Sequence, residues 1–100
     1  GEATKSGTTA TEAVELVRQI AQLPNVRIRG LMTMPPFFDD PELARPYFKE
    51  LRLLADQIRN EQIPDVEMAE LSMGMSGDFE VAIEEGATLV RVGTAIFGER

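Results

Sequence analysis

The chain has 100 residues and a mass of 11.1 kDa, the size of one small domain, and its 43% hydrophobic and 27% charged residues are typical of a globular protein. The absence of cysteine and histidine excludes disulfides, thiolate catalysis and cysteine-type zinc sites, and it removes the usual general base. The net charge of −7 disfavours nucleic acid and anionic membrane surfaces as partners. No apolar run approaches the roughly 20 residues that cross a bilayer, and no secretion signal opens the chain, so a cytoplasmic location is predicted.

The first two predicted elements are a helix and a strand. Apolar residues recur at three- and four-residue spacing from about Thr9 to Leu23, and Thr9 with Glu12 has the form of a capping box. Apolar and polar residues then alternate over Val26 to Met32, which predicts a strand. Met34-Pro35-Pro36 must end it, because proline cannot donate to a strand ladder.

The middle of the chain predicts a second helix and a second strand. Pro46 would clash inside a helix, so a short irregular turn is expected at 41–45 and the main helix from about Pro46 to Asn60. The acidic residues at 84–85 and 39–40 are expected to be solvated helix ends. A short apolar run around Met68 to Leu71 then predicts a strand.

The last third of the chain predicts a loop, a short helix and a third strand. The loop covers 72–77 and opens a helix over Asp78–Glu85, with Ser76 as the expected N-cap and Gly86 as the left-handed stop. Leu89 to Val92 is expected to be a strand, and 96–98 the start of another helix.

Helices and strands alternate with short connections, which favours an α/β fold with parallel strands and crossover helices. Three strands leave two edges unpaired and one face of the sheet uncovered. We therefore expect residues 1–100 to form a single fragment, about the last three βα units of a longer α/β barrel or doubly wound domain. Such a piece is expected to associate with itself or with the complementary segment.

Two loops have the composition of an anion site. The loop at 72–77 contains Gly74 and Ser76, and the end of the next strand carries Gly93 and Thr94; glycine lets a ligand approach the backbone, and amides and hydroxyls can donate to it. Loops after the last two strands of an eight-stranded barrel often form a phosphate site. Alternatively, Ser76 only caps a helix, the two glycines only form turns, and Met75 only packs at the rim.

Arg91 is the most informative charged residue. It lies in the apolar run 89–92, where an unpaired guanidinium is costly, so its partner is expected to be Glu67, Glu70 or a bound ligand. Neither lysine, Lys5 or Lys49, lies in a context that predicts a desolvated Schiff-base lysine.

Two long strings of residues resemble the pyridoxal phosphate homeostasis protein family (YggS/PROSC). These strings are Leu71-Ser72-Met73-Gly74-Met75-Ser76, followed by Asp78, Ala82, Ile83 and Gly86, and Val90-Arg91-Val92-Gly93-Thr94-Ala95-Ile96-Phe97-Gly98. Lys5-Ser6-Gly7 and Arg29-Gly30-Leu31-Met32 are similar to the family pattern in order and spacing. The resemblance spans nearly the whole chain.

The resemblance implies the C-terminal part of a TIM (β/α)8 barrel of the fold-type III alanine racemase N-terminal domain type, with pyridoxal 5′-phosphate (PLP) at the carboxyl ends of the strands. It implies that Ser76, Gly93 and Thr94 hold the phosphate and that Arg91 faces the pyridine nitrogen. The implied cofactor-binding set is Gly74, Met75, Ser76, Arg91, Gly93 and Thr94, with no catalytic residue and no metal ligand. The family's cofactor-linking lysine belongs to an early strand that this chain lacks, and Lys5 matches a different position.

The resemblance therefore implies a noncatalytic PLP-binding protein that acts in vitamin B6 homeostasis and amino-acid balance. An arginine beside the ring nitrogen weakens PLP as an electron sink, which suits a carrier or regulator. Two alternatives remain at this point: a PLP-dependent amino-acid racemase-like enzyme, and a barrel that binds another phosphorylated metabolite. Tyr47, the chain's one tyrosine, lies in an outer-helix pattern that favours packing.

Overall fold

The computed structural model describes residues 10–91. Its elements in chain order are helix α1 (Ala10–Ala21), strand β2 (Ile28–Met32), the 3-10 helix η1 (Pro41–Ala44), helix α2 (Arg45–Asn60), strand β3 (Val66–Ser72) and helix α3 (Phe79–Glu84). The predicted alternation of helices and strands is therefore confirmed over this range. The predicted features at Lys5, Thr9, Gly93, Thr94 and 96–98 lie outside the described residues.

Helix α1 is shorter at its carboxyl end than the periodicity predicts. The amides of Gln22 and Leu23 donate to the carbonyls three residues earlier, Gln19 and Ile20, so the last turn tightens to 3-10 geometry. Asn25 then adopts a positive φ of 65°, which turns the chain toward β2. Val14 and Val17 are the buried positions of α1, and they face the sheet.

Strands β2 and β3 pair in parallel, as the alternation predicts. Ile28 lies opposite Val66, whereas Gly30 lies opposite Glu70, so β3 contains two extra residues between these positions. This irregularity breaks the strict alternation of faces. It explains why β3 buries two residues that are three positions apart, Met68 and Leu71.

Helix α2 covers the sheet and supplies much of the core. Its buried residues follow the helical spacing of three and four positions: Phe48, Leu51, Ala55 and Ile58. Phe48 is fully buried. The irregular turn predicted before this helix is η1, which begins with Pro41, and Asp40 accepts the Glu42 amide at its N-cap. A proline in the first turn of a helix costs no hydrogen bond, so Pro46 is accommodated.

The predicted third strand is only partly formed in the described range. Leu89 makes an isolated parallel bridge with Ser72, and the Met73 amide donates to the Leu89 carbonyl over 3.0 Å. Thr88 replaces a regular ladder contact, because its Oγ1 accepts from the Leu71 amide at 2.8 Å. A side chain thus occupies the position of a backbone partner, so up to Arg91 this segment is a bridge and not a strand.

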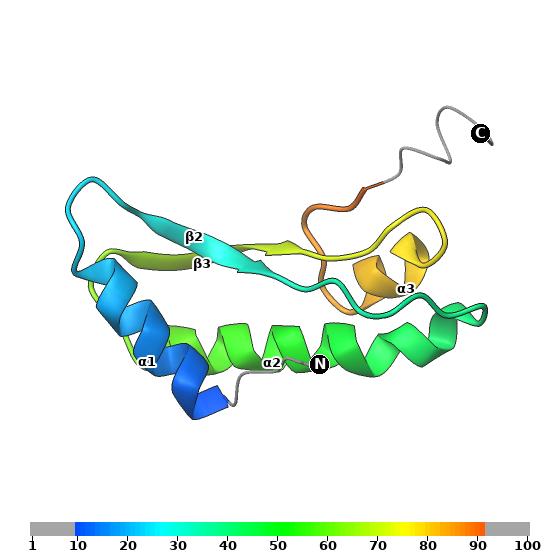
Figure 1. Ribbon diagram of the computed structural model, residues 1–100, viewed down its shortest axis with the longest axis horizontal. Coiled ribbons are helices and arrows are strands. Elements are labelled where there is room, and N and C mark those ends of the chain that lie inside the picture. Colours follow the sequence, from blue (N-terminus) through cyan, green and yellow to red (C-terminus); the bar gives the residue numbers. More distant parts are fainter. Residues whose placement is uncertain (1–9, 92–100) are drawn as a thin grey trace.

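The elements form two layers at the sheet (Figure 1). Helices α1 and α2 lie along one face of the β2–β3 pair, and α3 lies beyond its carboxyl end. No described helix covers the opposite face. Within residues 10–91, no helix has both the length and the apolar character needed to cross a bilayer.

Candidate functional site

A cavity of about 510 Å³ opens where the two strands end. Its walls come from residues 33–38, which follow β2, from residues 72–78, which follow β3, and from Arg91. Because the strands are parallel, both segments emerge at the same edge of the sheet. The Thr33 amide donates to the Ser72 carbonyl over 3.2 Å and holds the two walls together. The cavity lies within the size range of small-molecule sites.

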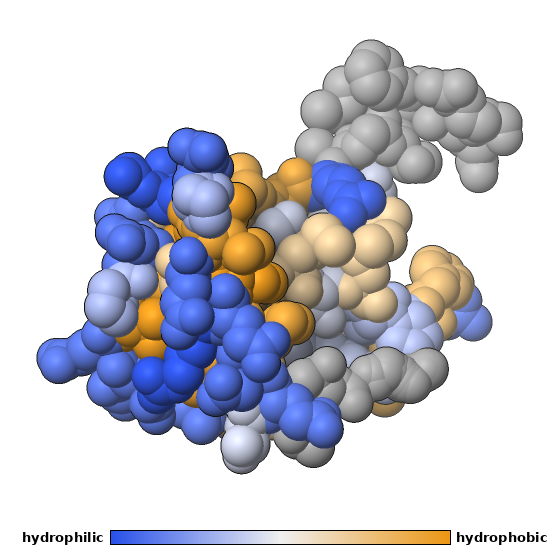
Figure 2. Space-filling view, turned by 60° about the vertical axis from the view of Figure 1, so that its left-hand side comes forward, coloured by the Kyte–Doolittle hydropathy of each residue, from blue (hydrophilic) through white to orange (hydrophobic). Residues whose placement is uncertain are grey.

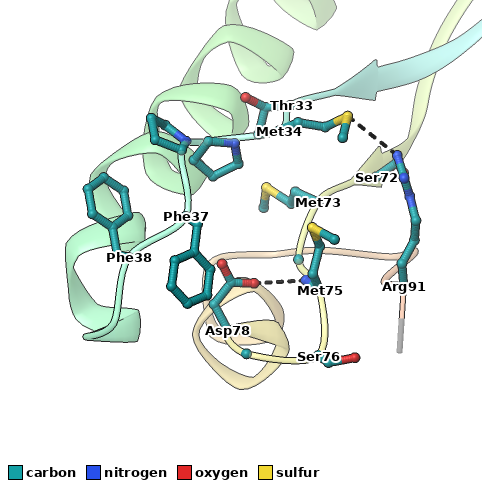
Figure 3. A pocket seen from close by; sticks show the side chains of 14 residues that line it. Thr33, Met34, Phe37, Phe38, Ser72, Met73, Met75, Ser76, Asp78 and Arg91 are labelled. Carbon is teal, nitrogen blue, oxygen red and sulfur yellow. Dashed lines mark hydrogen bonds between the residues drawn. The ribbon is translucent and has the colours of Figure 1, made fainter. Parts of the chain in front are cut away.

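The loop after β3 is closed by Asp78 and not by Ser76. Asp78 Oδ1 accepts the Met75 amide at 2.8 Å, and the Asp78 amide donates back to the Met75 carbonyl at 3.1 Å (Figure 3). These two bonds form a turn over 75–78, so α3 begins only at Phe79, with Asp78 as its N-cap. The prediction that Ser76 caps this helix is wrong, since Ser76 lies inside the turn, at the rim of the cavity.

Gly74 has no side chain because none would fit. Its φ is +103°, and a Cβ atom there would lie 2.7 Å from the Cβ of Ala82. The loop therefore passes directly over the first turns of α3, with Met73 buried beneath it at 2% exposure. Gly86 ends this part of the chain with a φ of +110°, as the sequence predicts.

Arg91 lies in the cavity wall without either of the carboxylate partners that the sequence suggests. Its backbone amide donates to the Gly74 carbonyl at 3.0 Å. Its Nη2 lies 3.6 Å from the sulfur of Met34 (Figure 3) and 3.6 Å from that of Met32. Glu70 instead accepts from the Thr88 hydroxyl, and Glu67 pairs with Arg29. A thioether is a weak acceptor, so the guanidinium keeps donor capacity for a ligand.

The segment after β2 forms an apolar wall that the sequence prediction missed. Met34 is 58% exposed and Phe37 is 84% exposed, and the rigid pair Pro35-Pro36 connects them. From the sequence, this segment was predicted only to end the strand. The missed signal was topological, because loops that follow neighbouring parallel strands meet at one edge. Among the described residues that line the cavity, Arg91 and Asp78 are the charged ones.

An ion-pair cluster fixes α3 behind the cavity. Arg45 pairs with Glu42, Glu84 and Glu85 at 2.7–2.8 Å, and Arg52 adds a 3.5 Å contact to Glu85. Hydrogen bonds from Arg45 lower the pKa of the Glu42 and Glu85 carboxyls, and the same bonds raise the pKa of the Arg45 guanidinium. The prediction that the acidic residues at 84–85 are solvated helix ends is therefore wrong for Glu85, whose side chain is 14% exposed.

Four of the six predicted cofactor-binding residues meet at this cavity: Gly74, Met75, Ser76 and Arg91. Gly93 and Thr94 lie outside the described range, so their place in the site stays a prediction. Within residues 10–91, no cluster of acidic side chains is arranged to hold a metal ion. Tyr47 does not line this cavity. Its ring lies 5.8 Å from that of Phe38, a residue of the cavity wall, and Tyr47 lines a separate groove on α2.

Parallel strands, crossover helices and a cavity at the carboxyl edge define the α/β class to which TIM barrels belong. The chain belongs to the alanine racemase N-terminal domain family, whose model matches residues 2–100. Its fold is that of part of this barrel domain.

Three relatives and two solved structures place the chain further. It is 54% identical over 100 residues to a pyridoxal phosphate homeostasis protein of Aquifex aeolicus and 49% identical to that of Vibrio alginolyticus, covering 43% and 42% of those proteins. The human protein of the same name is 40% identical over 102 residues, and the chain covers 37% of that protein. The chain thus spans about two fifths of the length of these relatives.

The solved structure of PipY from Synechococcus elongatus with PLP bound matches with a TM-score of 0.79 and 37% identity, over 94% of this chain and 44% of that one. A structure of an unknown protein from Bifidobacterium adolescentis matches with a TM-score of 0.85 and 43% identity, over 97% of this chain and 39% of that one. At these identities, the resemblance inferred from the sequence strings is confirmed.

Proposed function

We propose that the protein binds PLP and acts in intracellular vitamin B6 homeostasis without catalysing a reaction of its own. One observation carries the proposal: Arg91 and the loop at 72–78 line one cavity, in a fold that PipY shares and in which PipY holds PLP. The names of the Aquifex, Vibrio and human relatives support the homeostasis role.

The described side of the cavity fits the ring of PLP. Met34, Phe37 and Met75 offer apolar surface for a flat heteroaromatic ring, and the Arg91 guanidinium offers N–H donors at its edge. Bound PLP supplies an electron sink for amino-acid chemistry. Because arginine does not give up its proton, Arg91 would donate to the ring nitrogen and would keep that nitrogen unprotonated, which would weaken the electron sink. This arrangement favours a carrier or regulator over an amino-acid enzyme.

The phosphate would be held by Ser76 together with Gly93 and Thr94. The Met75 amide is already used by Asp78, so it contributes no donor to an anion in this arrangement. The phosphate would therefore also need donors from the loop that contains Gly93 and Thr94. In the loop at 72–77, the Ser76 hydroxyl at the rim of the cavity is the side-chain donor that we assign to the phosphate. The lysine that links PLP in the family is expected in a part of the protein outside this chain.

A titration of the purified protein with PLP, followed by absorbance and fluorescence, tests the proposal. Ser76→Ala and Thr94→Ala should each weaken PLP affinity by about tenfold, the value of one hydrogen bond to a charged group. Thr11→Ala removes a hydroxyl from the exposed surface of α1 and serves as the matched control. Unchanged affinity in both site variants would instead favour a different phosphorylated ligand or a different site.

The noncatalytic part of the proposal has a separate test. A racemase needs a second acid–base group facing the bound amino acid, and Tyr47, the chain's one tyrosine, lines a different groove. Incubation of the PLP-loaded protein with α-deuterated amino acids should show no loss of deuterium at enzymatic rates. Rapid exchange would establish the racemase-like alternative.

We also propose that this chain associates with a complementary part of the barrel or with a second copy of itself. Apolar surface gathers near the centre of this face, beside a hydrophilic border (Figure 2). Leu16, Val26 and Leu89 are each about half exposed. In the described range, β2 has no second strand beside it. Burial of such surface and pairing of such an edge both favour association. Sedimentation of the isolated 100 residues as a stable monomer would refute it.

A further inference from the structure

Methionine sulfurs gather at the end of the molecule that carries the cavity. Met34, Met73 and Met75 line the cavity and Met32 precedes it at the end of β2, while Met68 lies in the core. Exposure divides them sharply: Met32, Met34 and Met75 are 56%, 58% and 50% exposed, whereas Met73 and Met68 are 2% and 4% exposed. The chain has no cysteine, so these thioethers are its oxidisable sulfur.

Two of the exposed sulfurs contact one cation. Arg91 Nη2 lies 3.6 Å from Met32 Sδ and 3.6 Å from Met34 Sδ. Both contacts are weak, because thioether sulfur is a poor acceptor. The guanidinium is therefore held loosely at the wall of the cavity by two groups whose acceptor strength changes when they are oxidised.

We propose that Met32 and Met34 form an oxidation site through which a hydroperoxide controls Arg91. A sulfur lone pair attacks the terminal oxygen of the peroxide, an S–O bond forms and the O–O bond breaks. The sulfur loses two electrons and becomes a sulfoxide, and the peroxide is reduced. The proton on the terminal oxygen of the peroxide moves to the departing oxygen, which leaves as water or an alcohol.

The sulfoxide oxygen changes what holds Arg91. It is a polar acceptor, so it takes a charge-assisted hydrogen bond from the guanidinium in place of the weak sulfur contact. The Arg91 guanidinium is then held at the end of β2, so its N–H groups are less available to a ligand in the cavity. This last consequence rests on the proposed PLP function. The oxidation of Met32 and Met34 and the hydrogen bond from Arg91 to the sulfoxide do not.

The first experiment needs no ligand. The purified protein is treated with dilute hydrogen peroxide and mapped by peptide mass spectrometry, and the reaction of each arginine with phenylglyoxal is timed before and after. We expect sulfoxide at Met32 and Met34 before Met68, and about tenfold slower modification of Arg91 after oxidation, the value of one hydrogen bond to a charged group. Arg27, which is exposed on the chain before β2, is the internal reference.

The double variant Met32→Leu/Met34→Leu supplies the decisive comparison. Met75 remains oxidisable in it, so peroxide should still add oxygen to the protein while the reactivity of Arg91 stays unchanged. Methionine sulfoxide reductases should restore the original Arg91 reactivity in the unsubstituted protein. An equal slowing in the double variant, or no slowing in the unsubstituted protein, overturns the proposal.

A PLP titration separates this inference from the proposed function. If the untreated protein binds PLP, oxidation of a Met75→Leu variant, in which Met32 and Met34 are the exposed methionines, should weaken binding by about tenfold. The triple variant Met32→Leu/Met34→Leu/Met75→Leu should keep its own affinity after peroxide. If the untreated protein does not bind PLP, the proposed function fails, and the phenylglyoxal rates still decide whether oxidation controls Arg91. Binding that is equal before and after oxidation would contradict the functional consequence.

Discussion

Replacing Gly30 with alanine should force the two strands apart at the point that positions the site. A Cβ atom at Gly30 would lie 2.0 Å from the carbonyl oxygen of Glu70 and 2.7 Å from its carbonyl carbon. Both atoms belong to the backbone of β3, so no side chain can rotate away. The strands would have to separate by about 1 Å to restore an ordinary contact, in an interior packed like a crystal.

The cost can be worked from this geometry. Overpacking of this kind costs about 2 kcal/mol, and the loss of about one strand hydrogen bond adds about 1 kcal/mol. A loss of about 3 kcal/mol corresponds to a fall in Tm of about 12–24 °C for a domain of this size. The walls of the cavity should also shift, because the Thr33–Ser72 hydrogen bond lies just beyond the same strand pair.

Thermal unfolding followed by circular dichroism measures this effect, with Gly77→Ala as the matched control. A Cβ at Gly77 would meet nothing within 4 Å, and its φ is not positive, so this variant should stay within about 0.5 kcal/mol of the unsubstituted protein. Equal stability of the two variants would refute the reasoning, because it would mean that β2 and β3 do not approach each other as closely at Gly30 as described.

Three further predictions concern the core, the ion pairs and the last bridge. Phe48→Ala removes a fully buried ring and should cost about 3–5 kcal/mol in urea unfolding, whereas Phe37→Ala, at a ring that is 84% exposed, should cost no more than about 0.5 kcal/mol. Arg45 lowers the pKa of the Glu42 and Glu85 carboxyls below 4.5, so the stabilisation from these ion pairs is complete above that pH and is lost as the pH falls through the lowered pKa values. The difference in unfolding free energy between the unsubstituted protein and Arg45→Gln should therefore shrink on acidification. A difference that grows would contradict the pairing. Thr88→Val deprives the Leu71 amide of its acceptor and should cost about 1–2 kcal/mol, seen as faster hydrogen exchange at that amide; unchanged exchange would show that the bond is not formed.

Local patterns were sufficient for most of the fold. The helical spacing of apolar residues predicts the existence of α2, because burial of an apolar stripe outweighs weak local preferences. The pattern Tyr47, Leu51, Leu54 and Ile58 suggested the buried face, but the structure buries Phe48 and Ala55 together with Leu51 and Ile58. The prediction of a turn before Pro46 succeeded for a similar reason, since proline has few permitted positions in a helix. Gly86 at a positive φ was equally predictable.

Partner choice was not predictable from local patterns. Serine at position 76 and aspartate at position 78 are both good N-caps. The Met75 amide donates to Asp78 Oδ1, which closes a turn over 75–78 and leaves Asp78 at the N-cap position. Arg91 could have paired with Glu67 or Glu70, but Arg29 and Thr88 already engage those carboxylates. Competition of this kind depends on distances between elements, which a linear pattern does not contain.

The alternation of helices and strands was enough to predict an α/β chain with parallel strands. The glycine, hydroxyl and guanidinium groups that interrupt apolar runs, together with the family resemblance, predicted a site that includes Gly74, Met75, Ser76 and Arg91, and these four residues line one cavity. No local pattern indicated that the loop after β2 supplies the opposite wall, or that Met32 and Met34 contact Arg91; both follow from the folded arrangement. The physical reason is that side-chain contacts across a parallel sheet depend on strand register and on the irregularity in β3, and these are set by packing against α2 and not by neighbours along the chain.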